Sequence, residues 1–303
     1  MVDYKKIIKN RDLRLKILRL LSFVPDETMI KLQYRIKTGI RLNLKNPKRF
    51  TEKLQWYKLY YKNPLMIQCV DKFDVRSYVK SKGLGDILVP CYGVYDSTSS
   101  INWDGLPQSF VIKDTLGGGG NSVIIVENKD QINKHRLMKT MSKWTAIDAH
   151  IKDGGREWPY YCGKKHRIIV EKNIKPNNGS LTDYKFFCFN GTVVFVYAMS
   201  ERLIGESVKV NIYNRNFNKL NVMRVGDLPA GRMCKPKNYF RMVEIAEQLS
   251  KDFPHVRVDL YNVNGNILFG ELTFYNASGY MKYDPDKFDY MLGNKFILPG
   301  FKE

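Results

Sequence analysis

Apolar residues occupy every second position from Val256 to Leu260, and this period is typical of a half-buried β-strand. The polar residues 262–266 that follow are typical of a turn. β-branched and aromatic residues from Ile267 to Tyr275 then predict a second strand. The segment therefore predicts a β-hairpin near the C-terminus of the chain.

The loop length of this hairpin decides which side chains share a face. A two-residue turn at Asn264-Gly265 would place Asp259 and Glu271 on opposite faces, whereas a three-residue loop with a left-handed glycine would place them on one. We expect the three-residue loop, with Thr273 on the same face and nothing obvious neutralising the two carboxylates. Such oxygen ligands suit Mg²⁺. The alternative is that both carboxylates lie on the solvated face of an ordinary antiparallel pair.

Helical and strand periods fill the rest of the chain in a definite order. Helical periodicity covers residues 3–24, 27–38, 51–60, 66–82, 129–151 and 239–253. Strand patterns cover residues 87–95, 109–114, 122–127, 167–171, 183–189, 192–199 and 207–213.

The first 65 residues predict a small basic helical region. Residues 3–24 form an amphipathic pattern that Pro25 ends, and Asp26 is placed to cap the next helix. We interpret residues 3–24 as a helix docked on the globular body, with an interfacial helix at the inner membrane leaflet as the alternative. The aromatic residues of the third helical segment are predicted to be core residues, namely Trp56, Tyr57, Tyr60 and Tyr61.

The net charge of the chain indicates which class of partner it binds. The 303-residue chain has a formal net charge of +20, and residues 1–62 carry 17 Lys and Arg against 5 Asp and Glu, or +12. Such a density attracts nucleic acid, anionic lipid or acidic polysaccharide. The sequence has no RNP aromatic motif, zinc-finger spacing or clear helix-turn-helix, so we expect no nucleic-acid partner.

Composition also bounds the location of the protein. No run of 18 apolar residues occurs, and no small-residue cleavage site follows the basic N-terminus, so we expect a cytoplasmic protein, held at most peripherally at the membrane. The five cysteines form neither an even set nor a C-x-x-C pair and are interpreted as small hydrophobic residues, namely Cys69, Cys91, Cys162, Cys188 and Cys234.

A glycine run between two predicted strands is the second candidate for chemistry. Lys113 ends the strand 109–114, and the loop GGGGN leads to the strand 122–127. Glycine N–H groups can approach phosphate oxygens closely while a lysine supplies charge. The loop is not a Walker P-loop, because no G-K-[ST] follows and the next element is a strand. A flexible turn is the alternative.

The order of these features resembles the ATP-grasp superfamily, an α+β fold whose two subdomains grip ATP between antiparallel sheets. More narrowly, the motifs from residue 25 to the C-terminus resemble ATP-grasp amidoligases associated with capsule, O-antigen and teichuronopeptide synthesis. They are NPKRFTEKLQWYKLYYKNPL, VDKFDVRSYV, LPQSFVIK, GREW, IIVEKNI, DYKFFCFNG and GELTFYNASG. The resemblance implies a basic helical region at 1–65, a glycine-loop subdomain at 66–172 and a subdomain with the magnesium hairpin at 173–303.

The resemblance also implies roles for particular residues. The residues expected to contact phosphate are Lys72, Lys113 and the loop residues Gly117, Gly118, Gly119, Gly120 and Asn121. Glu171 is expected at the adenine edge, Lys185 at a phosphate or carboxylate, and Asp183 at the ribose or as a support. Magnesium ligands are Asp259 and Glu271, with Thr273 where relatives carry asparagine and Asn276 as a substitute, so a second Mg²⁺ is in doubt.

The implied reaction is ATP-dependent amide formation. The γ-phosphoryl group passes to a carboxylate, and an amine attacks the resulting acyl phosphate. Arg257 is the candidate for holding that intermediate and Lys185 for assisting it, with Arg76 and Arg156 as secondary candidates. The four histidines are interpreted as structural, although His166 is a candidate for lining the acceptor site. The other three are His135, His150 and His255.

The substrates implied are an anionic glycan, or a sugar-nucleotide or lipid-linked carboxylate, together with a small amine or amino acid. Three alternatives remain open. An ATP-grasp kinase would phosphorylate a sugar hydroxyl. A glycosyltransferase would use Asp284-Pro285-Asp286 as a D-x-D motif, although that triplet is more simply a turn. A binding module for polyanions would have no activity.

Overall fold

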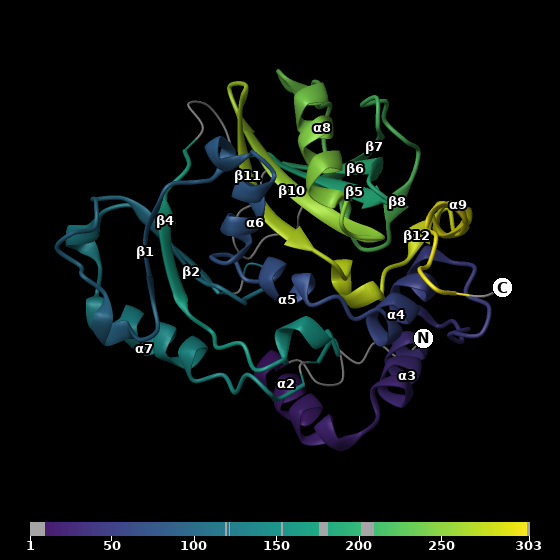
Figure 1. The fold of residues 1–303 in the computed structure, drawn as a ribbon, viewed down its shortest axis with the longest axis horizontal. Coiled ribbons are helices and arrows are strands. Elements are labelled where there is room, and N and C mark those ends of the chain that lie inside the picture. The colour runs from purple at the N-terminus through teal and green to yellow at the C-terminus, as the bar shows by residue number, and fades with distance from the viewer. Residues whose placement is uncertain are drawn as a thin grey trace.

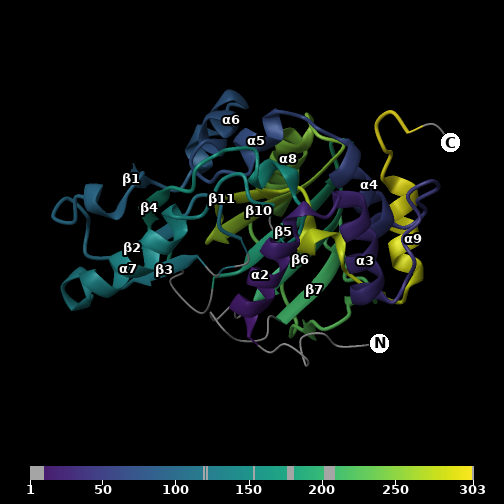
Figure 2. The same cartoon turned by 90° about the horizontal axis from the view of Figure 1, so that it is seen from below.

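Two β-sheets, built from separate stretches of the chain, form the frame of the protein (Figure 1). The structure is a computed structural model that describes residues 10–118, 120, 122–152, 154–175, 181–200 and 209–301. The four-stranded sheet lies at one end of the molecule with α7 (Lys134–Thr145). At the other end lie α3 (Asp26–Thr38), α4 (Phe50–Tyr60) and α9 (Lys287–Lys295) (Figures 1 and 2). The predicted α+β class with antiparallel sheets is confirmed.

The four-stranded sheet has the order β1-β4-β2-β3, and all its neighbours are antiparallel. Its strands are β1 (Cys91–Tyr95), β2 (Phe110–Asp114), β3 (Val123–Val126) and β4 (Ile168–Lys172). Helix α7 packs Met141 and Trp144 against Phe110 and Ile112 on one face. Because side chains alternate along a strand, the opposite face carries Lys113.

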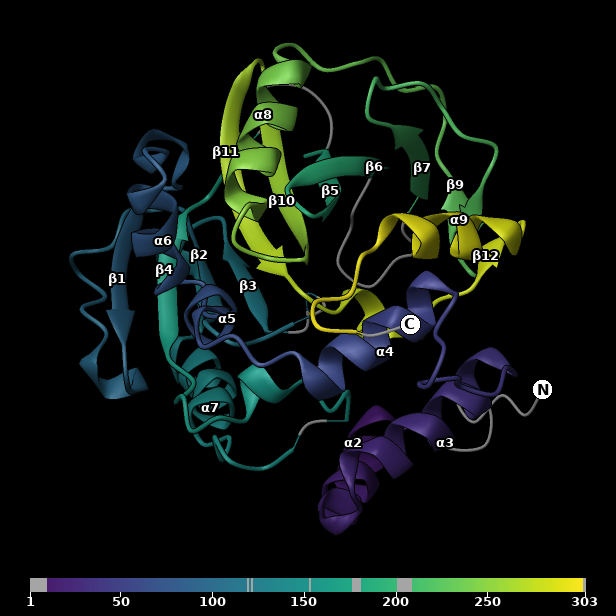
Figure 3. The ribbon, with the colours of Figure 1, turned by 45° about the vertical axis from the view of Figure 1, so that its right-hand side comes forward.

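The six-stranded sheet has the order β11-β10-β5-β6-β7-β9, antiparallel except for β7 and β9. Its strands are β5 (Asp183–Phe189), β6 (Thr192–Ser200), β7 (Lys209–Asn214), β9 (Leu228–Pro229), β10 (His255–Val263) and β11 (Asn266–Thr273). Helix α8 (Tyr239–Ser250) lies against this sheet (Figure 3). A small pair of β8 (Met223–Arg224) and β12 (Tyr283–Asp284) completes the strands described.

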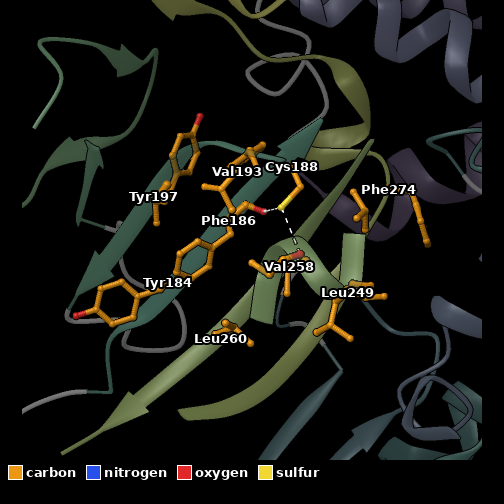
Figure 4. Packing of buried hydrophobic residues seen from close by; sticks show 14 of the residues in the cluster. Tyr184, Phe186, Cys188, Val193, Tyr197, Leu249, Val258, Leu260 and Phe274 are labelled. Carbon is orange, nitrogen blue, oxygen red and sulfur yellow. Dashed lines mark hydrogen bonds between the residues drawn. The ribbon is translucent and has the colours of Figure 1, made fainter. Parts of the chain in front are cut away.

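Apolar side chains fill the space between α8 and the six-stranded sheet. Figure 4 shows Phe186, Val258 and Leu260 from the strands together with Leu249 from α8. The Cys188 thiol donates to the carbonyls of Phe186 and Ala246, both at 3.7 Å. Since the apolar residues of β5 and β10 face α8, the intervening polar residues of these strands share the other face.

The N-terminal helices pack on the C-terminal part of the chain. They are α2 (Arg11–Leu20), α3 (Asp26–Thr38), α4 (Phe50–Tyr60), α5 (Leu65–Cys69) and α6 (Val75–Ser81). Arg49 nitrogens lie 2.5 and 2.7 Å from the Asp286 carboxylate just before α9 (Lys287–Lys295), and the Thr51 hydroxyl donates to Asp289 at 2.7 Å. Asp286 therefore serves a structural ion pair, which argues against a D-x-D metal motif.

Several predicted elements have different bounds. The predicted helix 66–82 is two helices, because the Asp71 carboxylate accepts from the amides of Phe73 and Asp74, each at 2.9 Å, and the Lys72 amide donates to Thr115. The predicted strand 87–95 begins only at Cys91, after a 3-10 turn at Gly85–Ile87. The helix predicted at 129–151 is confirmed only for Lys134–Thr145.

Some predicted core residues lie elsewhere. Tyr57 is fully buried, but Trp56 is only partly buried and Tyr60 is 48% exposed. All five cysteines are free. Cys69 and Cys188 are buried, as small hydrophobic residues would be, whereas Cys162 and Cys234 are exposed. Asp26 begins α3 without a side-chain cap and instead contacts Lys152 and Arg156.

His255 confirms the structural interpretation. It lies within 4.9 to 5.4 Å, between ring centroids, of Phe50, Phe189 and Phe296. Its Nδ1 lies 2.9 Å from the Cys188 carbonyl, and burial lowers its pKa to about 3. The ring is therefore neutral and donates through Nδ1.

The predicted boundaries near residues 65 and 172 stay predictions, although the two sheets lie on either side of the second one. The predicted amphipathic segment 3–24 is helical where described, from Arg11 to Leu20, and residues 1–9 lie outside the described part. Among the described helices, none is both long and apolar enough to cross a membrane.

Candidate active site

The hairpin of β10 and β11 brings the predicted carboxylates together by an unexpected route. Its loop is the two-residue turn Asn264-Gly265, with φ of 54° and 94°, so the prediction of a three-residue loop is wrong. The register shifts further along, where Leu260 pairs with Phe269 but Asp259 pairs with Glu271. One extra residue on β11 restores the shared face, which is the effect of a β-bulge.

Gly270 is that extra residue. A Cβ atom at this position would lie 3.0 Å from the backbone oxygen of Asp259, closer than side-chain carbons normally approach. Glycine therefore lets the bulge close against β10. The bulge sets the register of the carboxylates, because without it Asp259 and Glu271 would face opposite sides of the sheet.

Cations neutralise the carboxylates of this face, contrary to the expectation from the sequence. The Arg257 guanidinium donates to both oxygens of Asp259, at 2.6 and 2.7 Å, and to Glu271 at 3.1 Å. Lys185 donates to Asp183 at 2.6 Å and also to Asp259, its neighbour across β5 and β10. These five residues form what we call the hairpin cluster.

Burial controls the protonation of the hairpin cluster. Burial raises the pKa of Asp259, and the charges of Arg257 and Lys185 oppose this effect. For Arg257, burial would lower the pKa, but the carboxylates of Asp259, Glu271 and Asp183 raise it overall. The guanidinium is therefore a permanent charge on a rigid strand.

The predicted magnesium ligands lie together around Arg257. The Thr273 hydroxyl donates to Glu271 at 3.2 Å, and the Asn276 side-chain oxygen accepts from Arg257. The Glu271 side chain is 39% exposed, whereas that of Asp259 is 3% exposed. Two carboxylates and a hydroxyl on one face are hard oxygen donors that fit Mg²⁺, which takes its remaining ligands from water and phosphates.

No group of three or more His, Cys, Asp or Glu residues placed to hold a metal occurs in the described part of the chain.

Lys113 and Glu171 face the same side of the four-stranded sheet. The Lys113 ammonium lies 2.7 Å from one Glu171 oxygen, and Arg76 lies 3.3 Å from the other. Both Glu171 oxygens are therefore engaged by cations, and its contact with an adenine edge remains a prediction. Arg76, a secondary candidate in the sequence, belongs to this site through Glu171.

Lys72 connects the glycine loop to the hairpin cluster. Its ammonium donates to the Gly117 carbonyl at the base of the loop. Burial lowers the pKa of Lys72, while the nearby carboxylates of Glu271 and Asp114 act to raise it. Lys72 therefore contacts the base of the loop and lies within electrostatic range of the Glu271 carboxylate on β11.

The steric surroundings differ among the described glycines of the loop. At Gly117 a Cβ atom would lie 2.6 Å from the Ser122 side chain, and Gly120 has a φ of 77°. At Gly118 a Cβ atom would meet nothing within 4 Å. Gly119 and Asn121 lie outside the described residues.

A set of ion pairs beneath the loop was missed in the sequence. Arg167 binds Asp71 at 3.0 Å and Asp74 at 2.8 Å. His166 lies 2.8 Å from the Asp114 carboxylate, so the structure places it under the loop rather than toward an acceptor. The only signal in the sequence was the basic run GKKHR before β4.

Arg156 is the one predicted cation that lies apart from this site. Its guanidinium donates to the carbonyl of Leu21 at 2.6 Å, to those of Ser22 and Val24 at 3.2 Å, and to Asp26 at 3.0 Å. Arg156 therefore binds the carbonyl groups at the C-terminal end of the N-terminal helical segment.

Solved structures with similar folds include several ligases. D-alanine–D-alanine ligase from Bacillus anthracis, complexed with ATP, has 18% identity and a TM-score of 0.42, covering 68% of this chain and 55% of that one. Biotin carboxylase from Campylobacter jejuni has 14% identity and a TM-score of 0.46, covering 82% and 49%. D-cycloserine synthetase has 13% identity and a TM-score of 0.41, covering 70% and 64%. The chain thus spans about half to two-thirds of these proteins.

The family comparison is more direct. No curated protein sequence matches the chain. The family described as TupA-like ATPgrasp matches residues 52–297, which include both sheets, the glycine loop and the whole hairpin cluster. The predicted ATP-grasp superfamily is therefore confirmed, and the chain belongs to the TupA-like ATPgrasp family.

Proposed function

We propose that the protein is an ATP- and Mg²⁺-dependent ligase that joins an amine to a uronic-acid-type carboxylate of a surface polysaccharide or its precursor. The observation that carries this proposal is the charge complementarity of the two sides of the site. It is supported by membership of the TupA-like ATPgrasp family, whose match covers both sides.

Cations are in excess on the side of the four-stranded sheet. Lys113 and Arg76 share the single carboxylate of Glu171, and Lys72 adds a third cation at the glycine loop. The carboxylates beneath the loop, Asp71 and Asp114, are each paired with a cation or histidine of their own. This side suits phosphate oxygens, which lysine and arginine bind well.

Carboxylates are in excess on the side of the six-stranded sheet. Three of them, Asp183, Asp259 and Glu271, share the two cations Lys185 and Arg257. This side suits a divalent cation. ATP bound with Mg²⁺ carries both partners, with phosphates for one side and a metal ion for the other.

The proposed reaction has two steps. A carboxylate oxygen attacks the γ-phosphorus of ATP, ADP leaves, and an acyl phosphate forms. The amine nitrogen then attacks the acyl carbon, inorganic phosphate leaves, and the amine loses a proton as the amide forms. Mg²⁺ held by Asp259 and Glu271 would offset the charge that builds up between the two anions.

Protein side chains perform the remaining work by position and charge. Lys113 and Lys72 would hold the terminal phosphates, and the glycine loop would cover them with backbone N–H groups. Arg257 is fixed by Asp259 and Asn276, so its guanidinium can stabilise the acyl phosphate without reorganising. The basic charge of residues 1–62 supports an acidic glycan as the carboxylate donor.

Supply of ATP supports a cytoplasmic location for this reaction. Peripheral attachment to the membrane is supported by the end of the N-terminal helical segment, where Leu20 is 76% and Phe23 is 81% exposed beside the basic residue Arg19.

A product analysis tests the proposal. The protein is incubated with ATP, Mg²⁺, a uronate and a set of amines and amino acids, and nucleotides, phosphate and product mass are measured. We expect ADP and phosphate in equal amounts and a product that contains the amine without a phosphoryl group. Formation of AMP, or a product that retains the phosphoryl group, would contradict ligation through an acyl phosphate.

A further inference from the structure

A second concave surface lies in the N-terminal helical region, away from the carboxylates of the hairpin. It is a groove of about 1240 Å³ between α3, the segment 41–45 and α4. Its charged and aromatic lining consists of Glu27, Lys31, Arg35, Arg41, Lys45, Trp56 and Tyr60. We call this surface the basic groove.

The cations of the basic groove exceed its carboxylates. Four cations line it against the single carboxylate of Glu27, a difference of three charges. Glu27 binds Lys31 and accepts from the Tyr60 hydroxyl at 3.0 Å. Within the described part of the chain, Arg35, Arg41 and Lys45 are exposed and make neither an ion pair nor a side-chain hydrogen bond. Their charges are therefore available to an anion.

Aromatic rings supply the other half of the lining. Trp56 and Tyr60 lie one helical turn apart on α4, with ring centroids 5.2 Å apart, and Tyr60 is 48% exposed. An aromatic surface packs against the apolar C–H face of a sugar ring, and guanidinium groups bind carboxylates through paired hydrogen bonds. The combination suits a chain of sugars that carries carboxylates.

The groove is large for a small ligand. Pockets for drug-sized molecules are typically about 300–1,000 Å³, so 1240 Å³ leaves room for several sugar units. Its cations are arranged along two segments of the chain rather than around one point. This arrangement favours a repeating anion over a single carboxylate.

Helix α4 connects the basic groove to the active site. Its opposite face donates from Gln55 to the carbonyls of Ser278 and Gly279, at 3.0 and 2.8 Å, and from Lys58 to Ser278 at 2.7 Å. These carbonyls belong to the short turn Asn276–Gly279, whose first residue contacts Arg257. A polymer in the groove would thus lie on the far side of one helix from the catalytic residues.

We infer that the basic groove binds a stretch of acidic, uronate-containing polysaccharide and so holds a polymeric acceptor beside the active site. The choice of a glycan over another polyanion rests on the proposed function. The binding itself does not need ATP or catalysis, so the two proposals can fail separately.

The test measures binding of the full-length protein to a fluorescent oligogalacturonate of defined length, without nucleotide. The groove variant carries Arg35→Gln, Arg41→Gln and Lys45→Gln. A matched variant removes three exposed cations from α7 instead, by Arg136→Gln, Lys139→Gln and Lys143→Gln. We expect the groove variant to bind about tenfold more weakly, from three surface contacts, and the α7 variant to lose far less.

Several results would overturn the inference. They are no binding by the unmodified protein, equal losses in both variants, or equal binding of the same oligomer with its carboxylates reduced to alcohols. Tighter binding of a single-stranded oligonucleotide or of anionic vesicles, with the same loss in the groove variant, would identify a different polyanion. In each case the inference would be wrong.

A second measurement separates this inference from the ligase proposal. Once turnover is found, the ratio of kcat/KM for an oligouronate to that for a single uronate is compared among the three proteins. We expect this ratio to fall about tenfold in the groove variant alone. Binding without any turnover would support the groove and count against the ligase, whereas turnover with an unchanged ratio would do the reverse.

Discussion

The two sheets of this protein carry opposite excesses of charge. On the four-stranded sheet, two cations share the Glu171 carboxylate and a third lies at the glycine loop. On the six-stranded sheet, three carboxylates share two cations, and Asp259 is almost completely buried. Neither side is therefore electrically neutral by itself, and a ligand that carries both phosphates and a metal ion would balance the charge of both.

The largest effect is expected from removing charge at the hairpin cluster. Asp259→Asn should lower kcat by at least two to three orders of magnitude, because the metal ligand is lost. It should also destabilise the fold by about 3 kcal/mol, because Arg257 and Lys185 would remain buried with less compensation. Turnover and urea unfolding measure the two effects.

Glu271→Gln separates these effects, since Glu271 is partly exposed. We expect a loss of about a hundredfold in kcat with a smaller change in stability. The control is Glu244→Gln on α8, whose side chain is 62% exposed and pairs with Arg241. Near-normal turnover of both hairpin variants would show that the carboxylates do not bind the metal.

A smaller effect is expected on the cationic side. Lys113→Ala should raise the KM for ATP by about 10- to 100-fold, because one charged contact to the phosphates is lost. Lys139→Ala on the exposed face of α7 is the matched control and should leave the KM for ATP unchanged. If Lys113→Ala altered only the KM for the carboxylate, the proposed assignment of the two sides would have to be exchanged.

The bulge that aligns the carboxylates gives a fourth prediction. Gly270→Ala places a methyl group 3.0 Å from the Asp259 carbonyl, so β10 and β11 must separate slightly. We expect a loss of about 1–2 kcal/mol in the free energy of unfolding, together with a reduced affinity for Mg²⁺. Gly231→Ala is the control, because a Cβ atom there meets nothing within 4 Å. An active variant of full stability would show that the bulge tolerates a side chain.

The last prediction concerns the acid stability of the six-stranded sheet. The folded state keeps His255 neutral, with a pKa of about 3, while the unfolded chain protonates it near 6.5. Stability is therefore lost as the pH falls from about 6.5 toward 3, by up to about 1.4 kcal/mol per pH unit. His255→Phe should reduce this slope in urea unfolding between pH 7 and pH 5. An identical slope would assign acid sensitivity to other groups.

Much of this architecture could be predicted from the sequence. Local hydrophobic periods predict the succession of the main strands along the chain. For example, β5 begins and ends where its pattern does, at Asp183 and Phe189. The break between α5 and α6 was not predicted, because besides the local Asp71 turn it uses a bond from Lys72 to Thr115, a residue far along the chain. Tyr60 is an aromatic residue of the kind expected in a core, yet it lies on the face of α4 that lines the basic groove.

The sequence predicts which residues form the candidate site, but not how their charges are balanced. The shared face of Asp259 and Glu271 depends on a one-residue bulge that hydrophobic alternation does not encode. The pairing of Asp259 with Lys185 depends on the register between β10 and β5, which cannot be read from the sequence. For the same reason the ion pairs under the glycine loop, such as His166 with Asp114, emerged only from the structure.

The most direct test of the central claim follows the oxygen atoms of the carboxylate. The uronate is labelled with ¹⁸O in its carboxyl group and turned over with ATP, Mg²⁺ and the amine, and the released phosphate is analysed by mass spectrometry. Transfer of the γ-phosphoryl group to the carboxylate predicts one ¹⁸O atom in each phosphate released. Unlabelled phosphate accompanying amide formation would contradict the account.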